Sequence, residues 1–283
     1  MKLVSFRHGG KDGFGVVKDD GIVDLTAAFF FDTRYVDLRQ AFAADTLAEL
    51  ERTARSSEAD LGLTDVSFLL PIPRPGKIFC AGGNYDSGGS APRVRPDYPT
   101  IFTRLPDSFA AHDAPILKPK VSDQLDYEGE LAVVVGRGGR HIAERDALGH
   151  VGGYTCLNEG SVRDWQTRGT QNCAGKSFYH SGSMGPWIVT ADEIPDPSKL
   201  RIRTRVNGET RQDGGTGGML FSIPFLISYI SRITPLEPGD IITTGSPDAS
   251  AVDLKMPKWL KAGDRVEIDI DGIGTLRNPV EAE

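Results

Sequence analysis

The sequence predicts a mostly β protein of the α+β class, in which a small N-terminal α+β unit precedes a larger domain. Three observations lead to this expectation. The 283 residues include 33 glycines and 18 prolines, which implies many turns between short elements. Runs rich in Val, Ile, Phe and Thr alternate with Gly, Asp and Asn turns along most of the chain. The segment LLPIPRPG, residues 69–76, contains three prolines and marks the boundary between the two parts.

The N-terminal unit is predicted over residues 1–70. Residues 1–6 and 14–25, MKLVSF and FGVVKDDGIVDL, are typical of short strands divided by Gly and Asp turns. Residues 35–56 have apolar side chains at helical spacing, so we expect a helix there. We interpret this unit as a packing or cap segment.

The larger domain is predicted over residues 71–283 as strands, turns and one long helix. We expect strands at residues 77–85, 99–105, 126–136 and 153–158, and the first turns of a helix at residues 161–166. Residues 200–212 contain Asn-Gly between two strand-like runs, which predicts a hairpin. Residues 219–233 predict an amphipathic helix with a proline near its start, and residues 236–247 and 263–280 predict closing strands.

The composition excludes several classes of protein. The balance of 32 Lys and Arg against 39 Asp and Glu gives a net charge of −7, so we expect no nucleic-acid partner. No apolar run approaches the roughly 20 residues of a membrane span, and the polar start does not resemble a signal peptide. The three cysteines, Cys80, Cys156 and Cys173, are widely spaced, which favours a reducing, cytoplasmic location and no zinc site.

A pair of acids opens the most apolar predicted strand. Glu128 and Glu130 precede the run Leu131–Val135, and residues two apart on a strand point to the same face. An exposed sheet edge is the simplest interpretation of two such acids. However, they adjoin an apolar run, and a third acid, Glu159, ends another predicted strand beside Asn158. Three converging carboxylates without matching cations would hold Mg²⁺, Mn²⁺ or Ca²⁺, and the run lacks the repeated Asp pattern of an EF-hand loop.

A series of motifs carries a resemblance to a known family. KIFCAGGNY, DYEGELAVVVGR, GYTCLNEGSVRDWQ, GKSF, GPWIVTADEIPDP, LEPGDIITTGSP and GDRVEIDIDGIGTLRN resemble, in order, segments of the fumarylacetoacetate hydrolase family. The resemblance covers about residues 75 to 280. It implies a mixed β-sandwich roll, a homodimer, a bound Mg²⁺ or Mn²⁺, and a small-molecule 2-oxo or 1,3-diketo acid, such as an acylpyruvate, as substrate. It implies first of all a hydrolase that cleaves a C–C bond through a metal-stabilised enolate.

The resemblance also implies roles for individual residues. Glu128, Glu130 and Glu159 match the metal ligands, although the family usually has aspartate at the position of Glu159. Lys176 and Gln166 match catalytic residues of the pocket, and Lys176 could alternatively be a surface lysine. The matches to substrate-binding residues are Tyr85, Arg104, Thr244, Gly245 and Ser246. Arg163 is expected to hold the start of a helix.

The sequence departs from the family where hydrolytic members carry a His–Glu pair that activates water. Gly88 and Ala91 stand at those two positions, and Gly218 replaces another family acid. Loss of a general base typically costs about 10²- to 10⁴-fold in rate. We therefore keep three alternatives to the hydrolase: a decarboxylase or lyase, a tautomerase, and a metal-binding protein without turnover. His112 and His180 are candidate substitute bases, and residues 86–98 are expected to form a lid.

Overall fold

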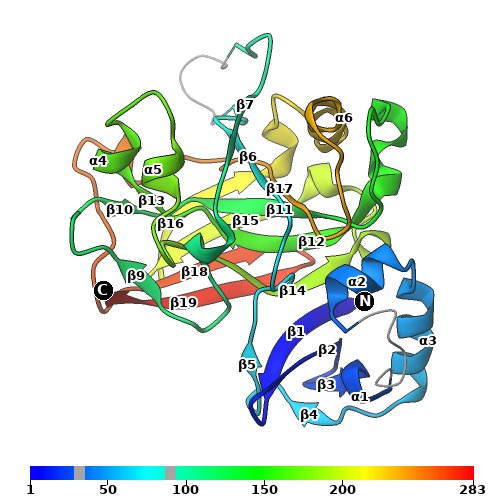
Figure 1. Cartoon of the computed structure of the whole chain (residues 1–283). Coiled ribbons are helices and arrows are strands. Elements are labelled where there is room, and N and C mark those ends of the chain that lie inside the picture. The colour runs from blue at the N-terminus through cyan, green and yellow to red at the C-terminus, as the bar shows by residue number, and fades with distance from the viewer. Residues whose placement is uncertain (29–35, 87–93) are drawn as a thin grey trace.

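The computed structural model describes residues 1–28, 36–86 and 94–283. Its largest sheet has twelve strands among the described residues, in the order β4-β3-β2-β1-β14-β12-β11-β17-β6-β7, with β5 on β1 and β8 on β14 (Figure 1). The bounds of these strands are β1 Lys2–His8, β2 Lys11–Lys18, β3 Gly21–Asp24, β4 Leu61–Gly62, β5 Ser67–Phe68, β6 Ile78–Gly82, β7 Thr100–Thr103, β8 Phe109–Ala110, β11 Gly129–Val135, β12 Val151–Asn158, β14 Gly182–Thr190 and β17 Ile241–Thr243.

A second sheet packs across the first one. It has the order β16-β15-β18-β19-β9, and a separate two-stranded pair joins β10 to β13. The bounds are β9 Ile116–Lys118, β10 Leu125–Asp126, β13 Ser161–Val162, β15 Arg201–Val206, β16 Glu209–Gly215, β18 Arg265–Ile270 and β19 Gly274–Ala282. Parallel and antiparallel pairs occur in both larger sheets, which confirms the predicted mixed β fold of the α+β class.

Helices are short and few by comparison. Their bounds are α1 Leu25–Ala28, α2 Leu38–Ala43, α3 Leu47–Ser56, α4 Arg163–Gln166, α5 Cys173–Lys176 and α6 Ile223–Ile233, with 3₁₀ turns at Pro106–Ser108, Glu144–His150, Ala191–Glu193, Pro197–Lys199, Thr216–Gly218 and Ala251–Asp253. The helix predicted over residues 35–56 is divided, because Asp45 takes a left-handed φ of 54° between α2 and α3. In the described residues, no helix has the length and apolar character that crossing a membrane requires.

The predicted hairpin and the predicted long helix are both present. Asn207 and Gly208 join β15 to β16 with φ values of 53° and 79°, the positive pair that a two-residue hairpin turn requires. Helix α6 begins at the Ser222 side chain, which accepts a hydrogen bond from the Phe225 N–H. Its Pro224 stands in the first turn, where no hydrogen bond is lost.

Strand β11 is buried on both faces, which explains its continuous apolar run. Leu131, Val133 and Val135 belong to the core between the two larger sheets. The alternate residues Ala132 and Val134 belong to a second core, which also contains Leu3 and other residues of the N-terminal strands. Because side chains alternate along a strand, the positions of the apolar residues also determine the face on which Glu128 and Glu130 lie.

The N-terminal strands are continuous with the larger sheet. Strand β1 pairs antiparallel with β14, through Lys2 opposite Val189 and Leu3 opposite Ile188. Figure 1 shows this junction where the blue strand β1 meets β14. The division into a unit over residues 1–70 and a domain over residues 71–283 stays a prediction.

Candidate active site

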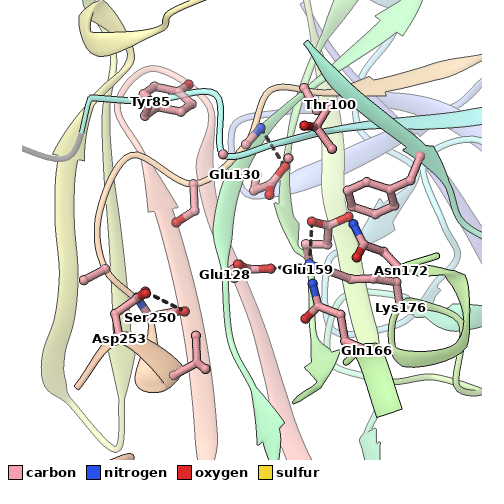
Figure 2. Close-up of a pocket in the computed structure, with 18 of the residues that line it drawn as sticks. Tyr85, Thr100, Glu128, Glu130, Glu159, Gln166, Asn172, Lys176, Ser250 and Asp253 are labelled. Carbon is pink, nitrogen blue, oxygen red and sulfur yellow. Dashed lines mark hydrogen bonds and ion pairs between the residues drawn. The ribbon is translucent and has the colours of Figure 1, made fainter. Parts of the chain in front are cut away.

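A cavity of about 520 Å³ opens at the ends of β6, β7 and β11. Its wall combines acids, two basic side chains and neutral hydrogen-bonding groups. The lining residues with side chains include Tyr85, Thr100, Phe102, Glu128, Glu130, Glu159, Arg163, Gln166, Asn172, Lys176, Ser246, Asp248, Ser250 and Asp253. Figure 2 shows the three glutamates pointing toward one another, with Lys176 beside them.

Backbone pairing brings the three glutamates together. Glu128 and Glu130 alternate with Gly129 at the start of β11, and Gly129 lies opposite Asn158 at the end of β12. Asn158 Oδ1 accepts a hydrogen bond of 3.0 Å from the Glu128 N–H, and the Glu159 N–H donates to the Glu128 carbonyl at 2.8 Å. The three carboxylates form a group that we call the carboxylate cup: Glu128, Glu130 and Glu159.

The carboxylate cup fits a divalent cation. One carboxylate oxygen from each glutamate lies within 4.8 Å of the other two. Oε1 of Glu159 is buried and has no hydrogen-bond partner, so it is free to serve as a ligand. Burial, together with the charges of Glu159 and Glu128, raises the pKa of Glu130 well above its usual value. Carboxylate oxygens are the ligands that Mg²⁺ and Mn²⁺ prefer, and the crowding of acids favours a bound cation.

Two basic side chains contact the cup, contrary to the sequence-based expectation of acids without matching cations. The buried Lys176 Nζ donates to Oε2 of Glu159 at 2.9 Å and to Oε2 of Glu128 at 2.5 Å. Arg163 Nη2 lies 2.8 Å from Oε1 of Glu128. Burial raises the pKa of Glu128, but the charges of Lys176 and Arg163 outweigh it and lower that pKa to about 2.

Lys176 is a cavity residue and not the surface lysine of the alternative interpretation. It ends α5, and its residue is only 3% exposed. Burial lowers the pKa of Lys176, but the carboxylates of Glu128 and Glu159 reverse the direction and raise it. Lys176 therefore carries its positive charge at neutral pH.

Arg163 starts α4, as expected, and it also joins three parts of the site. Its Nε donates to the buried Asp126 at 2.8 Å, its Nη1 to Gln166 Oε1 at 2.9 Å, and its Nη2 to Ser250 Oγ at 2.9 Å. Asp126 and Ser250 are site residues that were not predicted from the sequence. Asp126 stands two residues before Glu128, so the same alternation that led to the glutamates was an available signal.

Three of the five predicted substrate-binding residues line the cavity. Tyr85, Gly245 and Ser246 do, and the Tyr85 hydroxyl lies 3.0 Å from Thr244 Oγ1. Thr244 is fully buried behind the wall, where its hydroxyl donates to the Leu131 carbonyl. The Gly245 N–H, which the resemblance assigns to a substrate carboxylate, here donates to Glu130 Oε2 at 2.9 Å.

Arg104 does not line the cavity in this structure. Its guanidinium group is buried behind Glu159, where it donates to Ser108, to the Gly160 carbonyl and to Ser181. It also lies over the ring of Phe109, 4.2 Å from the centroid. These contacts assign Arg104 a structural role in holding the segment around Glu159.

The two candidate substitute bases also lie outside the cavity wall. His112 is 6% exposed, accepts the Arg277 N–H at its Nδ1, and packs edge-on against Phe68. His180 stacks on the ring of Tyr179 at 4.1 Å between centroids. The structure therefore brings neither histidine to the carboxylate cup.

The remaining departures from the family are Gly88, Ala91 and Gly218. Gly88 and Ala91, and most of the predicted lid over residues 86–98, fall on residues 87–93, which lie outside the described residues. Gly218 is described, and its carbonyl accepts the Asp86 N–H at 3.0 Å. A Cβ at Gly218 would lie 3.3 Å from the Asp86 carbonyl oxygen, so the chain passes close to it.

Comparison with known proteins identifies the family. The model of the fumarylacetoacetate hydrolase C-terminal domain matches residues 77–281. This chain belongs to the fumarylacetoacetate hydrolase family. A curated relative, the oxaloacetate tautomerase YisK of Bacillus subtilis, is 42% identical over 285 residues, which is 94% of each chain.

Solved structures support the same assignment. A fumarylacetoacetate hydrolase from Exiguobacterium antarcticum is 32% identical, with a TM-score of 0.84 over 100% of both chains. The maleylpyruvate hydrolase of Sphingobium sp. SYK-6, solved with manganese and pyruvate, is 28% identical, with a TM-score of 0.83 over 100% of this chain and 99% of that one. The relatives of this chain within the family thus include hydrolases and a tautomerase.

Proposed function

We propose that this protein is an enzyme that requires Mg²⁺ or Mn²⁺ and converts the enol and keto forms of a small 2-oxo or 1,3-diketo acid into one another. Decarboxylation of the same substrates is the closest related reaction. The observation that carries this proposal is a cavity that keeps three carboxylates and Lys176 but whose described lining residues include no histidine. The 42% identical oxaloacetate tautomerase supports the same choice.

The chemistry of tautomerisation suits this set of residues. The reaction moves one proton between carbon and oxygen and consumes no water, so it needs no base that activates a water molecule. Hydrolysis needs such a base, and the sequence has Gly88 and Ala91 where hydrolytic family members have histidine and glutamate. Neither glycine nor alanine has a side chain that accepts a proton.

Each group of the cavity has a proposed task. Glu128, Glu130 and Glu159 would hold the ion through oxygen ligands. When bound, the ion supplies Lewis-acid stabilisation of negative charge on the substrate oxygens. The ammonium group of Lys176 adds a second positive charge at the same place, and Gln166 donates from its amide. The Ser246 hydroxyl lines the same cavity, where it would orient a substrate carboxylate, and the Gly245 N–H holds Glu130 through the hydrogen bond to its Oε2.

A second candidate function is hydrolysis of a C–C bond. The structural neighbour named maleylpyruvate hydrolase, solved with manganese and pyruvate, favours it. A residue other than the missing pair would then have to activate water. A metal-binding protein without turnover is the third reading, and the polar groups retained around the cup speak against it.

One assay separates the three functions. The purified protein is incubated with Mg²⁺ or Mn²⁺ and with oxaloacetate or a series of acylpyruvates. Loss of the ultraviolet absorbance of the enol is followed, and the products are identified by NMR. The proposal expects rapid, metal-dependent loss of enol without cleavage products, and Glu128→Gln should abolish it. Acylpyruvate cleavage at ordinary enzyme rates, about 1–10³ s⁻¹, would support the hydrolase instead. No change with any compound would support the binding protein.

The missing pair can be tested directly. The double variant Gly88→His with Ala91→Glu restores both side chains, and the proposal expects it to cleave acylpyruvates faster than the parent. Equal cleavage rates would mean that this pair does not limit hydrolysis. We also propose a homodimer, for which light scattering at micromolar concentration should give twice the 30.6 kDa mass of the chain.

A further inference from the structure

We propose that Gln212 is a positioning residue that fixes the geometry of the carboxylate cup and of the turn opposite it. Gln212 lies on β16, in the smaller of the two packed sheets, and is 2% exposed. It does not line the cavity. The inference rests on the proposed function, because it concerns how the same site is held in place.

A gap in the large sheet creates the need for such a residue. Strands β11 and β17 pair from Val134 opposite Ile241 to Ala132 opposite Thr243. The last backbone–backbone hydrogen bond between the two segments runs from the Thr244 N–H to the Leu131 carbonyl, at 3.1 Å. Gly245 then takes a φ of 92°, and the chain turns away. Beyond this point Gly129 and Glu130 still pair with β12 on one side, but β17 no longer runs beside them on the other. The Gly129 N–H therefore needs a partner other than β17.

The side chain of Gln212 occupies this gap and uses all of its hydrogen-bonding capacity. Its Oε1 accepts the Gly129 N–H at 2.9 Å and the Thr204 hydroxyl at 2.8 Å. Its Nε2 donates to Ser246 Oγ at 2.8 Å and to the Asp248 carbonyl at 3.0 Å. One buried amide therefore joins the peptide between two cup glutamates to the segment that carries Ser246.

Gly129 makes this contact between the sheets close. A Cβ on Gly129 would lie 2.3 Å from Thr204 Oγ1, so only glycine allows β15 to approach β11 this closely. Thr204 is also the residue directly opposite Gln212 in the pairing of β15 with β16. The close approach of Thr204 therefore brings Gln212, its partner across the two strands, into the gap. The glycine between Glu128 and Glu130 thus allows the contact with Gln212 as well as the spacing of the two acids.

The consequence concerns the cavity rather than stability alone. The two sides of the gap carry Glu128 and Glu130 on one side, and Gly245 and Ser246 on the other. Without the amide of Gln212, the Gly129 N–H and the Ser246 hydroxyl lose their shared partner. The two walls then stay joined through the Gly245 N–H and Glu130 Oε2, so their separation is held less tightly. Residues that orient metal ligands in this indirect way typically contribute about 10- to 100-fold to metal affinity.

The test compares two substitutions in the same buried network. Gln212→Met keeps the length of the side chain but removes all four hydrogen bonds. Thr204→Val removes only the bond between Thr204 and Gln212, and leaves the bonds to Gly129 and Ser246 intact. Mn²⁺ binding to the metal-free proteins is measured by calorimetry, and thermal stability is measured alongside. We expect both variants to lose stability, but only Gln212→Met to lose Mn²⁺ affinity, by about tenfold.

A second variant keeps the test informative if Gln212→Met does not fold. Gln212→Glu still accepts the Gly129 N–H but has no N–H to donate to Ser246 or Asp248. It should keep its Mn²⁺ affinity, while the affinity of the Mn²⁺-loaded protein for oxalate, used as the probe, falls by about tenfold. A tenfold loss of Mn²⁺ affinity in Gln212→Glu, or an unchanged affinity in Gln212→Met, would overturn the inference. If the parent itself binds no Mn²⁺, the proposed function fails instead.

Discussion

The Lys176 ammonium group donates a hydrogen bond of 2.9 Å to Glu159, and the two side chains are only 4% and 3% exposed. This is a buried ion pair inside the group of acids that fits a metal ion. Lys176 also pairs with Glu128. The same carboxylates can therefore pair with the Lys176 ammonium group or bind a metal ion. A bound metal ion would change the electrostatic environment of Lys176.

The first prediction concerns the loss of that ammonium group. Lys176→Met removes the ion-pair partner of the buried Glu159 in the metal-free protein, while Glu128 keeps Arg163, and breaking a buried ion pair from one side costs about 3–5 kcal/mol. We expect the free energy of unfolding to fall by about that amount without metal, and Mn²⁺ to raise the melting temperature more than it does in the parent. Chemical and thermal denaturation, each with and without Mn²⁺, measure both effects.

Lys118→Met is the matched control for this variant. Lys118 forms an ion pair with Asp123, whose side chain is 93% exposed, and such surface pairs contribute about 0–1 kcal/mol. The control should respond to Mn²⁺ like the parent. Equal responses of Lys176→Met and the parent would show that Lys176 does not neutralise the cup.

The second prediction follows from the raised pKa of Glu130. Burial and the neighbouring charges of Glu159 and Glu128 favour its protonated form without metal. A metal ligand must be ionised, so binding should release a proton, and affinity should fall as the pH falls through the raised pKa. Calorimetric titration with Mn²⁺ in two buffers of different ionisation enthalpy detects this release. Glu130→Gln should abolish it, and a parent binding heat that is the same in both buffers would contradict the assignment.

The third prediction tests the close approach at Gly129. Gly129→Ala places a Cβ 2.3 Å from Thr204 Oγ1, so the two sheets must shift apart locally. Overpacking of this kind costs about 1–3 kcal/mol, which urea denaturation measures. Adding Thr204→Ala should recover part of the loss. Gly149→Ala, at a glycine with no atom within 4 Å of the new Cβ, should have little effect.

The fourth prediction concerns pH and His112. Burial, opposed by Asp113 and assisted by Arg277 and Arg265, lowers the pKa of His112 from 6.5 to about 4. Between these two values the unfolded chain binds more protons than the folded one, so His112 makes stability rise with pH across that window. Acidification from pH 6.5 to pH 4 should therefore remove up to about 3 kcal/mol through this group.

Urea denaturation at a series of pH values measures that slope. His112→Asn should reduce it. His141→Asn, at an exposed position with a φ of 53° that asparagine tolerates, should leave it unchanged. An unaltered slope in His112→Asn would mean that other groups control the acid sensitivity of this protein.

The convergence of the three acids could be predicted from the sequence because it depends on local strand geometry. Alternation along one strand puts Glu128 and Glu130 on one face, and the end of the neighbouring strand brings Glu159 beside them. The division between α2 and α3 also had a local signal, since Asp45 and Thr46 are of the residue types that precede the first turn of a helix. That signal was outweighed by the helical spacing of the apolar residues around it.

Other parts of the site depend on packing between distant segments. Gln212 is 83 residues away from Gly129 in sequence, and no periodicity connects the two. The resemblance suggested Arg104 for the substrate, but the residue is buried behind Glu159, since Ser108, Gly160 and Ser181 supply its partners. Contacts of this kind become visible only when the two sheets are packed together.

The pairing of β1 with β14 has a consequence for the solubility of shortened forms of the chain. Without β1, the N–H and C=O groups of Ile188 and Val189 would form an open sheet edge, which is a template for pairing with another chain. The apolar residues of the second core that pack against Leu3 would also meet water. A fragment that begins after Pro75 should therefore aggregate, even though it contains every residue of the carboxylate cup. Strand β1 therefore keeps the protein from associating through the edge of β14, although no residue of β1 lines the cavity.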